Sequence, residues 1–318
     1  MKLIDLHCDT IMRFYAGAHL AELTDGHIGL SRLRAGECMA QCFAIFVPTG
    51  AAAERHGISE TPEEYFQTAY AAFQRELARC ADSIRLSRSA EEILANDAAG
   101  YMSAVLTVED GVTLAGRLEN LDDYYEKGVR MVALTWNYEN SLGYPQSRDA
   151  AQNRLGLKPF GIAAVERMNE LGIAVDVSHL SEGGFWDVAR VSRKPFVASH
   201  SCCRHYRDIA RNLSDAQLRA VAESGGVVGV NFAADFLHDA AGDPFTSCEW
   251  VVKHLRHMAD VGGMELPALG SDYDGIRSRM EWKDCGGAQM LAEAIVREFG
   301  ASDAEKICSG NALRDIIG

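Results

Sequence analysis

The chain opens with Leu3-Ile4-Asp5-Leu6-His7-Cys8-Asp9, a short apolar run that passes directly into a histidine and an aspartate. Seven further β-rich apolar runs follow along the 318 residues, separated by longer segments of helical period. The predicted strands span residues 3–6, 39–47, 103–108, 129–134, 173–177, 196–199, 227–231 and 269–271. Crossovers of this length indicate parallel pairing, and near-continuous apolar strands are typical of a sheet covered on both faces. The sequence therefore predicts an α/β fold, a (β/α)8 barrel of TIM type.

No Pro-, Gly- or Ser-rich linker divides the chain, so residues 1–318 are expected to form a single catalytic barrel domain. An open, doubly wound sheet has a similar rhythm and stays an alternative. Three connections that follow strands are long and polar, and in a barrel they would lie at its mouth: 48–61, 137–157 and 232–247. Capping boxes are predicted to open helices at Ser214 and at Ser302, each with Gln or Glu three residues later.

Composition and charge exclude several classes of protein. A content of 47% hydrophobic and 24% charged residues is typical of a soluble globular protein and excludes disorder. The net charge of −14 repels phosphate backbones, so no nucleic-acid partner is expected. No uncharged apolar run is long enough for a membrane span, and an acid at position 5 interrupts any signal-like start, so a cytoplasmic protein is expected. The nine scattered cysteines are expected to be reduced and mostly buried.

Polar side chains with metal-binding chemistry follow five of the predicted strands. His7 and Asp9 are two residues apart, so both leave the same face of an extended chain. The others are single residues at strand ends, namely Glu109, His179, His200 and Asp272. Each alone could be a turn acid or a hydrogen-bonded histidine, but the strand ends of one barrel converge. Three histidines and three carboxylates at one rim suit one or two divalent cations such as zinc or manganese.

Other residues with reactive side chains are expected to have structural roles. Cys8 lies between His7 and Asp9 and therefore points to the opposite, buried face. His254 and His257 are three residues apart on a predicted helix and are expected to be exposed to solvent.

At these positions the chain resembles the membrane dipeptidase (renal dipeptidase, M19) family of metal-dependent hydrolases. The resemblance covers nearly the whole chain in order. It includes the His-x-Asp start, the glutamate on the third strand, two histidines twenty-one residues apart, and four later motifs: Ser199-His200-Ser201, Arg211-Asn212, Gly270-Ser271-Asp272-Tyr273-Asp274-Gly275 and Gly310-Asn311-Ala312-Leu313-Arg314. The resemblance implies an α/β barrel, a dipeptidase activity and a homodimer.

The resemblance also assigns roles to individual residues. It implies two zinc ions per chain, with His7 and Asp9 for one ion, His179 and His200 for the other, and Glu109 as the bridge. It implies that Asp272 is the catalytic acid/base beside Glu109, and that Arg211 binds the terminal carboxylate of the substrate. The planar guanidinium of Arg211 would suit a bidentate grip on that carboxylate.

One segment departs from the family pattern. Where the family usually carries Thr-His-Asn after the fourth strand, this chain has Thr135-Trp136-Asn137. Trp136 and Asn137 are therefore predicted to bind substrate, but the indole N–H of Trp136 can only donate a hydrogen bond and cannot titrate. Packing of Trp136 against the barrel mouth is the alternative.

Three functions follow from this reasoning. The first is a binuclear zinc metallohydrolase that cleaves the amide bond of dipeptides with a free C-terminal carboxylate, L,D-dipeptides among them. The second is a related barrel hydrolase acting on N-acyl amino acids, cyclic amides or lactones. Such enzymes usually open with His-x-His and often use a carboxylated lysine as the bridging ligand. The third is a catalytically weak metal-binding or assembly protein.

Overall fold

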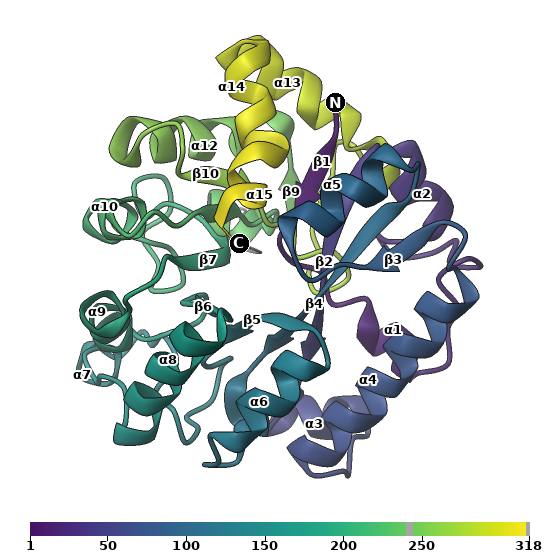
Figure 1. The fold of residues 1–318 in the computed structure, drawn as a ribbon. Coiled ribbons are helices and arrows are strands. Elements are labelled where there is room, and N and C mark those ends of the chain that lie inside the picture. The colour runs from purple at the N-terminus through teal and green to yellow at the C-terminus, as the bar shows by residue number, and fades with distance from the viewer. Residues whose placement is uncertain (240–243, 316–318) are drawn as a thin grey trace.

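Eight parallel strands close into a barrel in the computed structural model, which describes residues 1–239 and 244–315 (Figure 1). Around the barrel these strands are β1 (Leu3–Asp5), β2 (Cys38–Phe46), β4 (Met102–Glu109), β5 (Val129–Ala133), β6 (Ala174–Asp176), β7 (Phe196–Ser201), β8 (Val228–Val230) and β10 (Pro267–Leu269). The ring closes where Asp5 of β1 pairs with Leu269 of β10. The predicted barrel is confirmed, with strand ends shifted by up to two residues.

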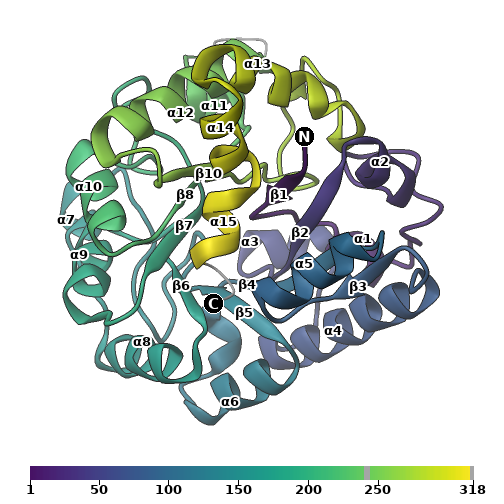
Figure 2. The same cartoon turned by 45° about the horizontal axis from the view of Figure 1, so that its top comes forward.

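The described helices lie outside the barrel wall: most of them surround it as a ring and α15 crosses one end of it, as Figures 1 and 2 show from two directions. They are α1 (Ile11–Tyr15), α2 (Leu30–Ala35), α3 (Ala51–His56), α4 (Pro62–Arg79), α5 (Ala90–Ala98), α6 (Glu119–Glu126), α7 (Ala150–Asn153), α8 (Pro159–Leu171), α9 (Glu182–Val191), α10 (Asp215–Glu223), α11 (Ala234–Leu237), α12 (Cys248–Gly262), α13 (Gln289–Phe299), α14 (Ala301–Glu305) and α15 (Asn311–Asp315). None of the described helices combines the length and apolar character that spanning a bilayer requires.

Three short strands lie outside the eight that were predicted. β3 (Ile84–Leu86) pairs with the first residues of β4 beside the barrel wall. β9 (Phe245–Thr246) and β11 (Arg279–Met280) pair with each other in the loops that follow β8 and β10. These strands extend the barrel wall and the loops and do not change the order of the eight barrel strands.

Capping boxes open two of the described helices. The capping box at Ser214 and Gln217 opens α10, as predicted. An unpredicted box at Thr61 and Glu64 opens α4. The box predicted at Ser302 is wrong, because the cap lies two residues earlier, at Gly300, and α14 begins at Ala301 without a side-chain cap.

The barrel interior is filled with apolar side chains, so the barrel is a packed core and not a channel. This cluster consists of Ile4, Leu6, Met39, Ala40, Cys42, Ile93, Val105, Met131, Val197, Val227, Ala268 and Ala312. Ala312 comes from α15, which meets the start of β10: Asn311 donates to Pro267 O at 2.8 Å. The N-terminal end of the barrel is thus closed, and the other end is left for chemistry.

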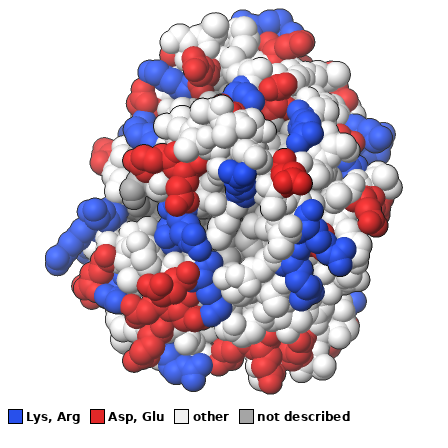
Figure 3. Space-filling model, turned by 45° about the vertical axis from the view of Figure 1, so that its right-hand side comes forward, with Lys and Arg blue, Asp and Glu red and all other residues white. Residues whose placement is uncertain are grey.

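Charges are mixed on the surface of this acidic protein. Over the face in Figure 3, described acidic and basic residues are interspersed rather than gathered into one broad basic area.

Eight of the nine cysteines are buried and all nine are unpaired, as expected for reduced thiols.

Candidate metal centre

The six predicted ligand and acid/base residues meet at the C-terminal end of the barrel. His7 and Asp9 follow β1, Glu109 ends β4, His179 follows β6, His200 lies in β7, and Asp272 follows β10. All three long loops also reach this end, because Ala52, Asn137 and Phe236 line one cavity of about 380 Å³ together with Glu109 and Asp272. Residues 240–243 of the third loop lie outside the described part of the chain.

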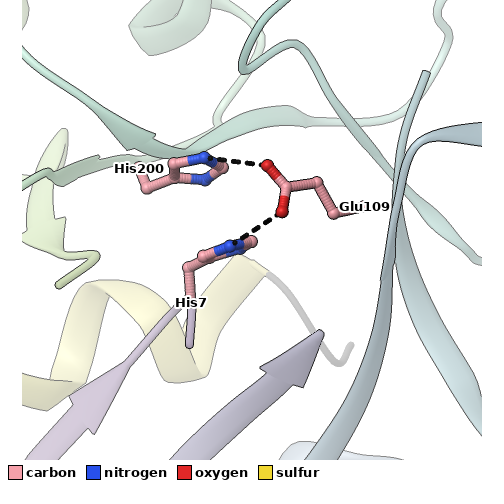
Figure 4. Close-up of side chains that lie close together, drawn as sticks. All are labelled: His7, Glu109 and His200. Atoms are coloured by element: carbon pink, nitrogen blue, oxygen red, sulfur yellow. Dashed lines mark ion pairs between the residues drawn. The ribbon is translucent and has the colours of Figure 1, made fainter. Parts of the chain in front are cut away.

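Glu109 lies at the middle of the cluster, with His7 and His200 facing its carboxylate (Figure 4). Its Oε1 is 3.0 Å from His179 Nε2 and 3.5 Å from His200 Nε2. Its Oε2 is 3.4 Å from His7 Nε2. One carboxylate therefore contacts all three imidazoles, which is the arrangement a bridging ligand requires.

The donor atoms form two overlapping groups. Ligand atoms of His7, Glu109 and His200 lie within 4.8 Å of one another, and so do those of His7, Asp9 and Asp272. His179 joins the first group, because its Nε2 is 3.0 Å from His200 Nε2. Each of these two overlapping groups of nitrogen and oxygen donors could hold a metal ion.

Two buried polar atoms at this cluster lack hydrogen-bond partners among the described residues. They are His7 Nε2 and Asp9 Oδ1, which lie 3.4 Å apart. Buried polar atoms are nearly always bonded, so two bare ones that face each other indicate a missing partner. Gly275 leaves room for that partner, since a Cβ there would lie 2.1 Å from Asp9 Oδ2 and 2.3 Å from Asp272 Oδ1. These residues fit a divalent cation.

Outer hydrogen bonds orient two of the histidines. His200 Nδ1 lies 2.7 Å from Ser199 Oγ, which in turn donates to Asp176. His179 Nδ1 lies 3.2 Å from Asn137 Oδ1. When Nδ1 carries the proton, the Nε2 lone pair points into the site, as metal-binding histidines require. Asp176 was not predicted; a carboxylate inside an apolar strand was its only sequence signal.

Asp272 is held by both its backbone and its side chain. Its N–H donates to His7 O at 3.1 Å, and its Oδ2 accepts from Asn231 Nδ2 at 2.9 Å. Asp272 and His179 have φ angles of 61° and 67°, in the left-handed region that non-glycine residues rarely adopt. Such strain concentrates at functional sites, where the surrounding structure maintains it.

The buried carboxyl groups repel one another. Burial and the charge of Asp9 raise the pKa of Glu109 to about 8 and that of Asp272 to about 6. Burial alone would lower the pKa of His7, but Glu109 and Asp9 outweigh it, so that pKa lies well above its usual value. A cluster of this kind favours positive charge between its members.

The other two imidazoles are held neutral. Burial, together with the nearby charges of His7 and Arg211, places the pKa values of His179 and His200 well below their usual value. A neutral imidazole is the form that binds a metal ion.

Trp136 and Asn137 both line the cavity above the cluster. The partly buried Trp136 ring packs edge-on against Phe46, with ring centroids 4.8 Å apart. Asn137 directs its amide oxygen to His179, so the structure gives this residue an orienting contact in addition to its place at the cavity.

Arg211 is buried beneath the two neutral histidines. It donates from Nη1 to Ser201 Oγ at 2.7 Å and from Nη2 to His200 O at 2.8 Å. It also lines a second cavity, of about 650 Å³, beside the metal cluster. Phe236 lines both cavities.

The structure also places three residues to which the sequence gave no part in the site. Cys8 is fully buried, as predicted. The exposure predicted for His254 and His257 is wrong: His254 is fully buried on the inner face of α12, and the side chain of His257 is only 12% exposed beside Asp215. Helical period alone did not reveal that α12 turns this face inward.

A (β/α)8 barrel with histidines and carboxylates gathered at its C-terminal mouth defines a metal-dependent hydrolase of the barrel type. The model of the membrane dipeptidase family, peptidase family M19, matches residues 1–316. The chain belongs to this family and is a metallo-dipeptidase.

Relatives and solved structures agree with this membership. An uncharacterized protein in the pqqA 5′ region of Klebsiella pneumoniae is 35% identical over 226 residues, which cover 69% of this chain and 82% of that protein. A metallopeptidase of Rhodobacter sphaeroides, solved with a phosphinate mimic of the dipeptide L-Ala-D-Ala, is 28% identical with a TM-score of 0.89, covering 98% of this chain and 97% of that one. The M19 metallopeptidase named dipeptidase AC is 27% identical with a TM-score of 0.89, covering 100% of this chain and 99% of that chain.

Proposed function

We propose that the protein is a binuclear zinc dipeptidase that hydrolyses dipeptides with a free C-terminal carboxylate, L,D-dipeptides among them. The observation that carries the proposal is the pair of buried, unpartnered atoms His7 Nε2 and Asp9 Oδ1 within a cluster of six ligand-type side chains. The dipeptide mimic bound to the similar Rhodobacter metallopeptidase supports the substrate class.

The residues would divide the two ions between them. His7 and Asp9 would hold one, His179 and His200 the other, with Glu109 between the two. Zinc bound at these ligands supplies the Lewis acidity that activates water and polarises a carbonyl group. Glu109 contacts His7 of the first group and His179 of the second. Its carboxylate would therefore be shared by the two ions.

The chain itself supplies proton transfer and positioning. Asp272, fixed by Asn231, would accept the proton of the attacking water and return it to the leaving amine. Arg211 would hold the terminal carboxylate of the substrate. Trp136 lines the cavity where the family usually has a histidine, and its indole N–H can donate to a carbonyl oxygen.

The same reasoning bears on the alternatives. Glu109 lies between the histidines, where a bridging ligand would be, and the His-x-Asp start differs from the His-x-His start of lactone and cyclic-amide hydrolases; both points support the dipeptidase. A homodimer, a cytoplasmic location and one catalytic domain over residues 1–318 remain part of the proposal; light scattering of the purified protein tests the first.

The decisive experiment measures the zinc content of the purified protein and the activity of one variant. Protein purified without chelators is expected to hold about two zinc ions per chain, and Asp272→Asn is expected to lose at least ~10²-fold in kcat on L-Ala-D-Ala with its zinc retained. Unchanged hydrolysis would contradict the acid/base role, and loss of zinc would make Asp272 a ligand instead. A wild-type enzyme that cleaves lactones but no L,L- or L,D-dipeptide would overturn the substrate class.

A further inference from the structure

We propose that the cavity beside the metal centre binds a second anionic group, so that the enzyme prefers dipeptides with an acidic C-terminal residue. Arg207 is the residue that would determine this preference. The inference rests on the dipeptidase function proposed above and names its substrate class more closely.

The cavity is basic in a protein that is acidic overall. Four arginines line it, Arg148, Arg204, Arg207 and Arg211, against the single acid Asp208. The whole chain carries a net charge of −14, so this cavity is a local reversal of sign. A concave wall with one sign of charge concentrates ligands of the opposite sign.

Two of these arginines have unmet hydrogen-bond donors. The Nε atoms of Arg207 and Arg211 are buried and have no hydrogen-bond partner among the described residues. Both side chains line the same cavity. A buried donor on a charged group is costly when it stays unbonded, and a carboxylate offers two oxygens to a guanidinium. The geometry therefore calls for an anion.

The remaining partners of these arginines separate their roles. Arg204 already donates from Nε to Asn212 O at 2.9 Å and lies 3.4 Å from Glu182, so it builds the wall. Arg211 uses one N–H of each terminal nitrogen on Ser201 and His200, so its Nε and the remaining N–H groups are left for the terminal carboxylate of the substrate. Among the described residues, Arg207 forms one ion pair, 3.5 Å to Asp239, whose side chain is 77% exposed. Water screens such a contact, and Arg148 is exposed to solvent, so Arg207 is the partly buried arginine of this wall with donors left for a ligand.

The cavity also lies where one end of a dipeptide would be. Arg211 joins it to the metal centre through His200 O, and Gln146, another wall residue, donates its N–H to His179 O at 2.7 Å. The substrate residue whose terminal carboxylate binds Arg211 would therefore place its side chain toward Arg207. A side-chain carboxylate of Asp or Glu is the group that this wall would bind.

Isosteric substrate pairs test the proposal on the zinc-loaded enzyme. L-Ala-Asp against L-Ala-Asn, with L- and D-forms of the second residue, compares a charged with a neutral side chain of equal size. We expect wild-type kcat/KM to be at least ~10-fold higher for the aspartyl substrate, chiefly through KM, in line with the strength of charge-assisted hydrogen bonds. Arg207→Met is expected to bring the ratio to about 1, and Arg207→Lys to restore part of it.

Controls keep this result apart from the function proposed above. Arg75→Met removes the same charge from the exposed face of α4 and should leave the ratio unchanged. Equal hydrolysis of Ala-Asp, Ala-Asn and Ala-Ala would overturn the acidic preference while the dipeptidase stands. A preference for Ala-Asp over Ala-Asn that persists in Arg207→Met would overturn the role of Arg207. A preference for an acidic N-terminal residue alone, seen as Asp-Ala over Asn-Ala, would overturn it as well. Hydrolysis of no dipeptide at all would instead reject the proposed function.

Discussion

Gly275 is the residue that keeps the metal cluster open. It is exposed and its φ is not in the left-handed region, so the backbone accepts alanine there. An added Cβ would nonetheless lie within 2.3 Å of carboxylate oxygens of Asp9 and Asp272. We expect Gly275→Ala to lose zinc and at least ~10-fold in kcat, with the unfolding free energy of the metal-free protein changed by less than about 1 kcal/mol. Zinc analysis, steady-state kinetics and urea unfolding measure these effects.

Gly310→Ala is the matched control for this change. The added Cβ would lie 3.6 Å from Glu305 O, an ordinary contact far along the chain from the cluster. It should keep zinc content and kcat at the wild-type level. A Gly275→Ala protein with full zinc content would show that the two carboxylates do not meet around a cation.

His254 makes the stability of the protein depend on pH. Its Nδ1 accepts from Cys203 N at 3.0 Å and its Nε2 lies 2.9 Å from Leu237 O, which fixes the neutral form. Burial lowers its pKa from 6.5 to about 4. Because the unfolded chain binds this proton more readily, the contribution of neutral His254 is full above pH 6.5 and is lost as pH falls toward 4. The loss should approach about 3 kcal/mol.

His254→Gln isolates this effect, because glutamine offers one acceptor and one donor but does not titrate. Urea unfolding of both proteins at pH 7, 5.5 and 4.5 gives the difference in stability at each pH, and other titrating groups cancel. We expect the difference to shift in favour of His254→Gln as pH falls. A difference that is constant over this range would assign the low pKa to another cause.

Single residues were predictable where a simple rule places them. His7, Asp9, Glu109 and Asp272 were expected to meet because strand ends of a barrel converge, and they do. The burial of His254 could not be predicted, because it depends on contacts with Cys203 and Leu237, which lie in other elements. The same holds for the bond between Asn231 and Asp272.

At the scale of elements, apolar runs predicted all eight barrel strands, short ones included, whereas the short strands outside the barrel, which lack such a run, were missed. β4 (Met102–Glu109) is eight buried residues and was predicted almost to its ends. β3 (Ile84–Leu86) has three residues, with an exposed arginine at its centre, and exists only because β4 lies beside it. The wrong helix start at Ser302 has a similar origin, since the turn at Gly300 precedes the local capping signal.

α15 is attached to the barrel by one buried amide. Asn311 Nδ2 donates to Met264 O and to Pro267 O, both at 2.8 Å, and the residue is 1% exposed. Asn311→Ala leaves two carbonyl oxygens unsatisfied beneath the barrel. We expect a loss of about 2–3 kcal/mol in unfolding free energy, measured by urea unfolding at neutral pH.

Activity separates this structural role from a role in the site. Asn311 lies at the N-terminal end of the barrel, opposite the metal cluster, so kcat per folded molecule at 25 °C should stay within ~2-fold of the wild type. Ser302→Ala, on the exposed side of α14, should alter neither stability nor rate. An Asn311→Ala protein of wild-type stability would show that the two bonds contribute nothing.

For the whole molecule, the metal ligands tie together parts of the chain that are far apart in sequence. The cluster joins residues from position 7 to position 272, and the barrel closes where the first and last of its strands pair. The rhythm of the sequence predicted a barrel but left an open, doubly wound sheet as an alternative, and the pairing of β1 with β10 decides between them. It could not predict the basic cavity, whose wall comes from loops that only the finished fold brings together.

A ligand that binds only the folded state adds RT ln(1 + [L]/Kd) to its stability, so the zinc proposed here should stabilise the whole barrel. Binding at 1,000 times Kd adds about 4 kcal/mol, which corresponds to a rise of roughly 5–15 °C in Tm for a large domain. We therefore expect a chelator to lower Tm by about this amount, and added zinc to restore it. The same chelator already saturated with zinc should have no effect, and Gly275→Ala should show a smaller shift because its cluster is obstructed. Scanning calorimetry of these samples decides the matter: an identical Tm with and without chelator would mean that the six side chains meet without a structural ion between them.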